Sequence, residues 1–184
     1  MKQNQYWLNS VRARIFWLLI VFLAIPAFIF SQFTLENVEK EIEKEYPITH
    51  VNINNLKEKL SSSDSSEYLL FDIREKEEYD KSHIHSAIWI DPDMSGNDFI
   101  DQYGAKIKRK HLVFYCSVGK RSSIFVERVL KKALTANRET IANLRGGIFR
   151  WYNNGFPVVN ANGETDDIHP YNVYWGQLIE RRTK

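Results

Sequence analysis

The sequence predicts an α/β domain with a central parallel sheet flanked by helices, preceded by one transmembrane helix. Three observations carry this prediction. Short apolar runs alternate with amphipathic segments beyond residue 48, as in βα units. One long apolar run stands near the N-terminus. The 184 residues, 43% of them hydrophobic, can also bury one ordinary core, so a single folded domain is expected.

The first element is the apolar run of residues 15–30, which follows Arg12 and Arg14. It is longer than a signal-peptide core of about 7–15 residues and close to a full span of about 17–25. No small-residue cleavage site follows it, so we expect an uncleaved single-pass anchor, with a cleaved signal and a secreted protein as the alternative. Basic flanks stay in the cytoplasm. The N-terminus is therefore expected to be cytoplasmic and the remaining chain exported, to the periplasm if the source is bacterial.

The second element is a short amphipathic segment. Leu35, Val38 and Ile42 recur at helical spacing among charged residues, and Pro47 follows. We expect residues 34–47 to form a helical stalk between anchor and domain. A loosely ordered linker is the alternative.

The folded unit follows the stalk. Four apolar runs are expected as strands, at residues 68–73, 87–90, 112–115 and 140–144. Three amphipathic stretches are expected as helices, at residues 75–80, 98–107 and 122–134. The serine-rich residues 61–66 are expected as a loop.

Cys116, the only cysteine, ends the apolar run 111–115 and opens the loop 116–122, CSVGKRS. Open parallel sheets bind ligands beyond the carboxyl ends of their strands. A turn that contains Gly119 and leads into a helix can direct backbone N–H groups at the sulfur and favour the thiolate. We therefore expect a nucleophile rather than an inert buried thiol.

Composition limits the partners. A net charge of +2, from 25 basic and 23 acidic residues, makes no case for a nucleic-acid partner. One cysteine excludes an intrachain disulfide, and an oxidised or sulfur-loaded Cys116 must be discharged by another molecule. His83 and His85 could supply half a metal site, but the other histidines are scattered, so we expect no metal and no cofactor.

Four segments together carry a family resemblance. They are FDIREKEEY at residues 71–79, SHIHSAI at 82–88, the Cys116 loop, and LRGGIFRW at 144–151 leading to GFPV at 155–158. With these motifs the chain resembles the rhodanese, or sulfurtransferase, homology domain over residues 48–160. The resemblance implies that the Cys116 thiolate attacks a sulfane sulfur, becomes a persulfide, and passes that sulfur to cyanide or a thiol.

The resemblance also implies roles for individual residues. The N–H groups of residues 117–121 would cradle the anionic sulfur, and Arg121 would support the loop and attract an anionic donor such as thiosulfate. Asp72 and Arg74 would brace the site. The substrate-binding residues implied are Ser117, Val118, Gly119, Lys120, Arg121 and Ser122.

Loop length separates this interpretation from a related one. Cysteine phosphatases and related arsenate reductases have a loop of the pattern Cys-x5-Arg. Here only four residues separate Cys116 from Arg121. The shorter loop favours binding of a sulfur atom over binding of a tetrahedral oxyanion. Two departures from the family pattern concern specificity and local geometry. His85-Ser86 replaces a Pro-Gly turn, and Val118 is apolar where polar residues are frequent.

The expected organisation is then a cytoplasmic stub and anchor (1–33), a stalk (34–47), a rhodanese-like domain (48–160) and a C-terminal extension (161–184). We expect the aromatic stretch 169–176 in that extension to pack on the surface, with a lid over the pocket as the alternative. The function expected is a membrane-tethered, exported sulfurtransferase whose acceptor is a small molecule or a protein. The alternatives are a rhodanese-like binding or scaffold module with little or no catalysis, and a redox-sensing thiol.

Overall fold

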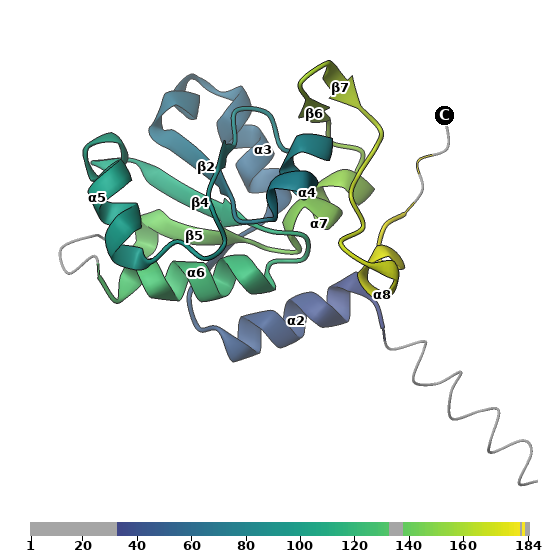
Figure 1. The fold of residues 1–184 in the computed structure, drawn as a ribbon, viewed down its shortest axis with the longest axis horizontal. Helices are drawn as coiled ribbons and strands as arrows, with labels where there is room; N and C mark the ends of the chain where they lie inside the picture. The colour runs from purple at the N-terminus through teal and green to yellow at the C-terminus, as the bar shows by residue number, and fades with distance from the viewer. Residues whose placement is uncertain (1–32, 133–137, 181, 183–184) are drawn as a thin grey trace, which may run out of the picture.

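A computed structural model describes residues 33–132, 138–180 and 182 (Figure 1). The apolar run 15–30, expected as the anchor, lies outside these residues. Within the described part of the chain, no helix is both long enough and apolar enough to cross a membrane.

A five-stranded, fully parallel sheet forms the centre of the domain (Figure 1). The spatial order is β1-β5-β4-β2-β3, so β4, which precedes Cys116, is the middle strand. The strands are β1 Thr49–Val51, β2 Tyr68–Asp72, β3 Ile88–Trp89, β4 His111–Tyr115 and β5 Ile141–Leu144. The predicted α/β class with a central parallel sheet and flanking helices is confirmed.

Helices connect and cover these strands. They are α2 Leu35–Glu45, α3 Ile53–Ser61, α4 Lys76–Lys81, α5 Gly96–Ile107, α6 Lys120–Leu130, α7 Gly147–Asn153 and α8 Val173–Gly176. Two 3-10 turns, η1 Ser63–Glu67 and η2 Arg138–Thr140, and an antiparallel hairpin of β6 Val158–Asn160 and β7 Gly163–Thr165 complete the described elements.

The core is split by the sheet into two apolar clusters. Successive residues of β4 alternate between them, because side chains along a strand point to opposite faces. Leu112 and Phe114 join the cluster of α5 and α6, whereas Val113 and Tyr115 join the cluster of α2, α3 and α7. Both faces of β4 are thus buried, which explains its continuous apolar run.

Several elements differ from expectation. The first strand and α3 were not predicted. The strand β1 has three residues at a sheet edge, which are too few to show an alternating pattern. The serine-rich loop contains a 3-10 turn without buried residues. Ser86, where a Pro-Gly turn is usual, adopts φ 65°, a left-handed conformation that favours glycine. The turn closes nonetheless, with Ala87 N–H donating to the Ile84 carbonyl at 3.0 Å.

The segment expected as a stalk forms a helix that packs on the domain instead of standing apart from it. Val38 and Ile42 of α2 are 9% and 4% exposed and belong to the core cluster of α3 and α7. Glu39, also buried, accepts a hydrogen bond from Arg150 Nε at 2.6 Å. The apolar stripe in the sequence was correct, but its partner surface comes from α7 and could not be recognised from the stripe alone.

Substitution of a buried α2 residue tests this packing. We expect Ile42→Ala to lower the free energy of unfolding of the full chain by about 2–5 kcal/mol, because it opens a cavity in the core. The control is Glu41→Ala on the exposed face of the same helix, which should change it by less than about 0.5 kcal/mol. Denaturant titration followed by tryptophan fluorescence measures both free energies of unfolding. Equal values for the two variants would contradict the packing of α2 on the domain and favour a helix that stands apart from it.

Candidate functional site

Cys116 lies at the carboxyl edge of the sheet, directly after the central strand β4. Its thiol is free and its side chain is 1% exposed. The Gly119 N–H donates to Cys116 Sγ at 3.2 Å. Gly119 adopts φ 102° and precedes α6, so the loop turns back on the sulfur and α6 begins beside it. The Gly119 N–H and the start of α6 thus both lie at the sulfur.

The start of α7 holds the cysteine loop through two backbone hydrogen bonds. Ile148 N–H donates to the Cys116 carbonyl at 2.9 Å, and Phe149 N–H donates to the Ser117 carbonyl at 3.0 Å. A side chain at Gly147 would place its Cβ 2.2 Å from the Cys116 carbonyl oxygen, so only glycine permits this approach. Gly147 in the 144–151 motif therefore allows the start of α7 to approach the cysteine loop.

Glu78 of α4 joins the loop from the other side. Its carboxylate is 1% exposed and accepts hydrogen bonds from Arg121 Nη1 at 2.7 Å, Arg121 Nη2 at 2.9 Å and Ser117 Oγ at 2.9 Å. It also accepts one from the Glu75 N–H at 3.1 Å. Arg121 Nη2 donates in turn to Ser117 Oγ at 3.0 Å. Arg121 thus contacts the loop as half of an ion pair, and its role in supporting the loop stays a prediction.

The charges of this pair reinforce each other. Burial acts to raise the pKa of Glu78, but hydrogen bonding to Arg121 and the positive charges of Arg121 and Arg74 outweigh it and hold that pKa below the ordinary value of 4.5. Burial acts to lower the pKa of Arg121, but the Glu78 carboxylate and the charge of Cys116 raise it above its usual range. Both side chains are therefore ionised at neutral pH.

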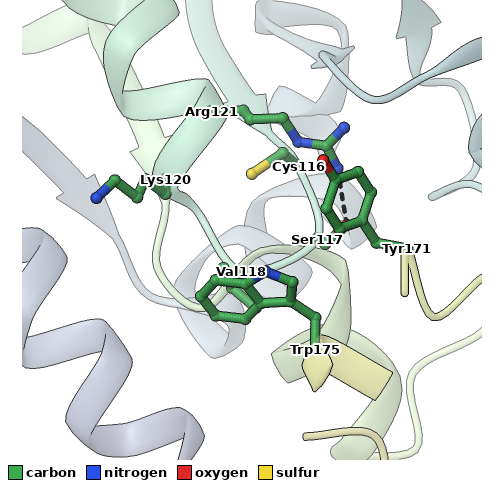
Figure 2. A pocket seen from close by; sticks show the side chains of 7 residues that line it. All are labelled: Cys116, Ser117, Val118, Lys120, Arg121, Tyr171 and Trp175. Atoms are coloured by element: carbon green, nitrogen blue, oxygen red, sulfur yellow. Dashed lines mark hydrogen bonds between the residues drawn. The ribbon is translucent and has the colours of Figure 1, made fainter. Parts of the chain in front are cut away.

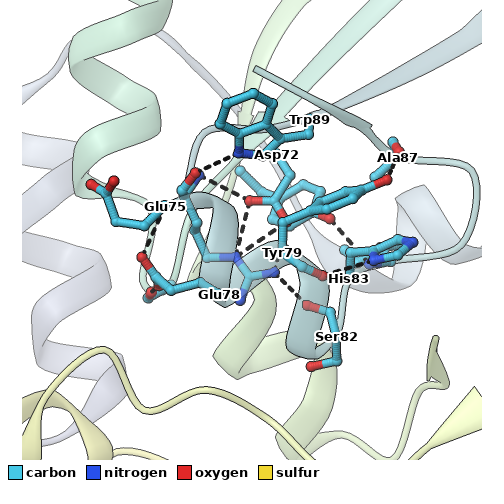
Figure 3. A network of polar contacts seen from close by, with 12 residues as sticks. Asp72, Glu75, Glu78, Tyr79, Ser82, His83, Ala87 and Trp89 are labelled. Atoms are coloured by element: carbon cyan, nitrogen blue, oxygen red, sulfur yellow. Dashed lines mark hydrogen bonds and ion pairs between the residues drawn. The ribbon is translucent and has the colours of Figure 1, made fainter. Parts of the chain in front are cut away.

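Asp72 and Arg74 form a second, fully buried ion pair. Figure 3 shows the network of polar contacts around Asp72. Arg74 Nε donates to Asp72 Oδ1 at 2.9 Å, and Arg74 Nη2 donates to the Ser82 carbonyl at 2.6 Å. Trp89 Nε1 donates to the Arg74 carbonyl at 2.9 Å. Neither charged residue lines the cavity described below, so their bracing role stays a prediction that this geometry suits.

Ser122 also points away from the cysteine. Its hydroxyl donates to Asn143 Oδ1 of β5 at 2.6 Å, and its side chain is fully buried. Lys120 lies at the edge of the site, where its ammonium pairs with Glu45 at 3.2 Å and stays half-exposed. Of the residues expected to bind substrate, Gly119 donates a hydrogen bond to the sulfur of Cys116. Ser122 instead links α6 to β5 through its hydrogen bond to Asn143.

A cavity of about 190 Å³ opens over the sulfur. The loop side contributes Cys116, Ser117, Val118, Lys120 and Arg121, and the opposite side contributes Tyr171 and Trp175 (Figure 2). The guanidinium carbon of Arg121 lies 4.6 Å from the centre of the Tyr171 ring. Two aromatic residues of the C-terminal extension therefore face the cysteine loop.

The extension is attached to the domain along its length. Leu178 is 6% exposed, and its carbonyl accepts a hydrogen bond from Asn153 Nδ2 at 2.8 Å. Arg182 lies 3.9 Å over the Tyr152 ring and donates to the Phe156 carbonyl at 2.5 Å. We expected surface packing here, and the segment both packs on the surface and walls the cavity.

Three site residues were not identified from the sequence. Glu78 lies in a recognised motif, and the Glu-x-x-Glu spacing of residues 75–78 was the available signal for its helix-start role. Tyr171 and Trp175 lie in an aromatic stretch, but nothing local shows that they meet Cys116. Among the described residues, no group of three or more His, Cys, Asp or Glu side chains could hold a metal ion.

The chain is similar in sequence to known proteins. The family model Rhodanese-like domain matches residues 53–154. A probable molybdopterin-synthase adenylyltransferase of Porphyra purpurea is 30% identical in an alignment of 132 residues that covers 68% of this chain. The chain spans only 32% of the length of that relative.

Two solved structures share the fold. The thiosulfate sulfurtransferase of Pseudomonas aeruginosa is 19% identical with a TM-score of 0.51, covering 72% of this chain and 23% of its own. The As-Sb reductase of Leishmania major is 21% identical with a TM-score of 0.51, covering 57% of this chain and 77% of its own. At these identities the likeness concerns the fold alone.

The Glu78 carboxylate offers a pH-resolved test. We expect Glu78→Gln to lower the free energy of unfolding by about 2–3 kcal/mol at neutral pH, because the hydrogen bonds to charged Arg121 weaken. The folded-state pKa of Glu78 is lowered, so this contribution is complete above the ordinary value of 4.5 and is lost as the pH falls through the lowered value. Denaturant titrations between neutral pH and about pH 3 should therefore show the gap closing only at the acid end.

Glu77→Gln is the matched control, since Glu77 is exposed on the same helix. It should leave stability nearly unchanged at every pH. A Glu78→Gln variant as stable as Glu77→Gln at neutral pH would contradict the role given to this ion pair.

Proposed function

Because this chain belongs to the family of rhodanese-like domains, we propose that it is a sulfurtransferase that carries sulfane sulfur on Cys116. The observation that supports this most directly is the sulfur itself, which accepts the Gly119 N–H at 3.2 Å beneath a small open cavity. A thiolate in that position can meet a donor while backbone N–H groups stabilise its charge.

The proposed reaction has two steps. The Cys116 thiolate attacks the outer sulfur of a donor such as thiosulfate, and the donor's S–S bond breaks with its electron pair on the leaving sulfite. The resulting persulfide then transfers its terminal sulfur to cyanide or a thiolate, and the electron pair of the broken bond restores the Cys116 thiolate. The single cysteine of the chain suits this scheme, since the acceptor is a second molecule.

The fold shared with an As-Sb reductase raises oxyanion reduction as another use of the same thiol. The loop argues for sulfur transfer. Only four residues separate Cys116 from Arg121, and the Arg121 guanidinium is engaged by Glu78 at 2.7 Å and 2.9 Å. A tetrahedral oxyanion would need both a wider loop and a free guanidinium.

We further propose that residues 15–30 tether the protein to a membrane with the domain on the exported side. The support is the uninterrupted apolar run after Arg12 and Arg14, with acidic residues following it. A cleaved signal remains the competing proposal.

Sulfur loading tests the enzyme proposal. The full chain incubated with thiosulfate should gain the mass of one sulfur atom by intact mass spectrometry, and cyanide should then remove it as thiocyanate. Cys116→Ser, checked for an unchanged circular dichroism spectrum, should gain nothing. A thiol that alkylates readily but loads from no sulfane donor would favour the binding-module alternative, and gain of oxygen or a mixed disulfide instead would favour a redox sensor.

Membrane fractionation tests the tether. The chain should stay with membranes through alkaline carbonate extraction, and protease added outside intact cells or spheroplasts should remove the domain. Release of a shortened chain into the soluble exported fraction would support cleavage. Protection of the domain in intact cells would overturn the proposed orientation.

A further inference from the structure

We infer that Tyr171 and Trp175 make the Cys116 cavity selective for sulfur donors that carry an apolar organic substituent of about one ring. This inference rests on the proposed sulfurtransferase function and specifies its substrate class. Both residues lie beyond residue 154, where the family match ends, so this wall is an addition to the shared domain.

The size and lining of the cavity favour such a substituent. Its volume of about 190 Å³ slightly exceeds the ~150 Å³ of an apolar cavity known to hold benzene. Val118 of the loop and Trp175 of the extension both line the cavity and supply apolar surface. A ring on the departing group of the donor would exchange water for these side chains.

The charges around the cavity give a small anion little to bind. Both terminal nitrogens of Arg121 donate to Glu78, at 2.7 Å and 2.9 Å, and Tyr171 stacks on the guanidinium at 4.6 Å. Lys120 is paired with Glu45 at 3.2 Å and shared with solvent. Each cation that lines the cavity thus already has a carboxylate partner.

The aromatic wall is held in place by specific contacts. Asn172 caps α8, because its Oδ1 accepts a hydrogen bond from the backbone N–H of Trp175 at 3.0 Å. The Trp175 ring lies 5.9 Å from that of Phe33, and Gly176 lies so close to Pro170 that a Cβ would be 2.8 Å from the proline ring. Trp175 is therefore positioned over the cavity by both ends of the described chain.

Tyr171 adds a second indication that the wall serves the site. It adopts φ 63°, which is unfavourable for a bulky residue, and its side chain stays 45% exposed. Core burial therefore does not offset the strain. What the conformation achieves is the stacking of the ring on Arg121 at the cavity mouth.

Two donors of equal charge isolate the effect of the substituent. Benzenethiosulfonate and methanethiosulfonate both present a terminal sulfur to the Cys116 thiolate. In each case the S–S bond breaks with its electron pair on the departing sulfinate, and the persulfide forms without any other oxidant or reductant. The two differ in whether a ring or a methyl group enters the cavity.

The experiment measures the rate constant of persulfide formation for both donors, by quenched-flow intact mass spectrometry of the full chain. The ratio of the two rate constants in a variant, divided by the ratio in wild type, cancels intrinsic donor reactivity. We expect Trp175→Ala to reduce the preference for the ring about tenfold, and Tyr171→Ala to reduce it in the same direction. A fall of both rate constants by the same factor would leave the ratio unchanged and would indicate a general disruption of the loop instead.

Val173→Ala is the matched control, because Val173 lies on α8 but is 88% exposed and does not line the cavity. Its donor ratio should equal that of wild type. An unchanged ratio in both Trp175→Ala and Tyr171→Ala would overturn the inference while leaving sulfur transfer intact. Failure of both donors to load wild type would instead count against the proposed function, so the two failures are distinguishable.

Discussion

The ion pair between Glu78 and Arg121 is the interaction on which the site depends. Glu78 belongs to the segment after β2, and Arg121 to the helix after β4, so one buried carboxylate joins two neighbouring strand ends. A lone carboxylate at this depth would be costly. Four hydrogen bonds offset that cost, and three of them come from the cysteine loop itself. The loop conformation and the ionisation of Glu78 therefore stabilise each other.

This arrangement changes what the arginine contributes. A guanidinium held by its own carboxylate positions the loop and adds little net charge for an incoming donor. In the proposed reaction, recognition of the donor would then rest on the Gly119 N–H at the sulfur and on the cavity walls. The pair of Asp72 and Arg74 is likewise a buried carboxylate held by a guanidinium, and Arg74 Nη1 there has no hydrogen-bond partner.

Local patterns in the sequence predicted the parts of the fold that are locally determined. The apolar runs of β2, β4 and β5 and the turn after Cys116 were recognisable because burial and glycine leave short-range signals. Contacts between distant segments were not. The pairing of Glu39 with Arg150 and the approach of Trp175 to Cys116 join residues that are far apart in sequence, so no periodicity or motif reports them. Val118 was the one local sign of an apolar cavity.

The contact of Phe33 with Tyr174 and Trp175 joins the two ends of the described chain at the cavity. The ring of Phe33 lies 4.2 Å from that of Tyr174 and 5.9 Å from that of Trp175. Phe33 stands two residues before α2, whose apolar face packs in the core. A displacement of Phe33 would therefore be transmitted to the cavity wall through ring contacts rather than through the sheet.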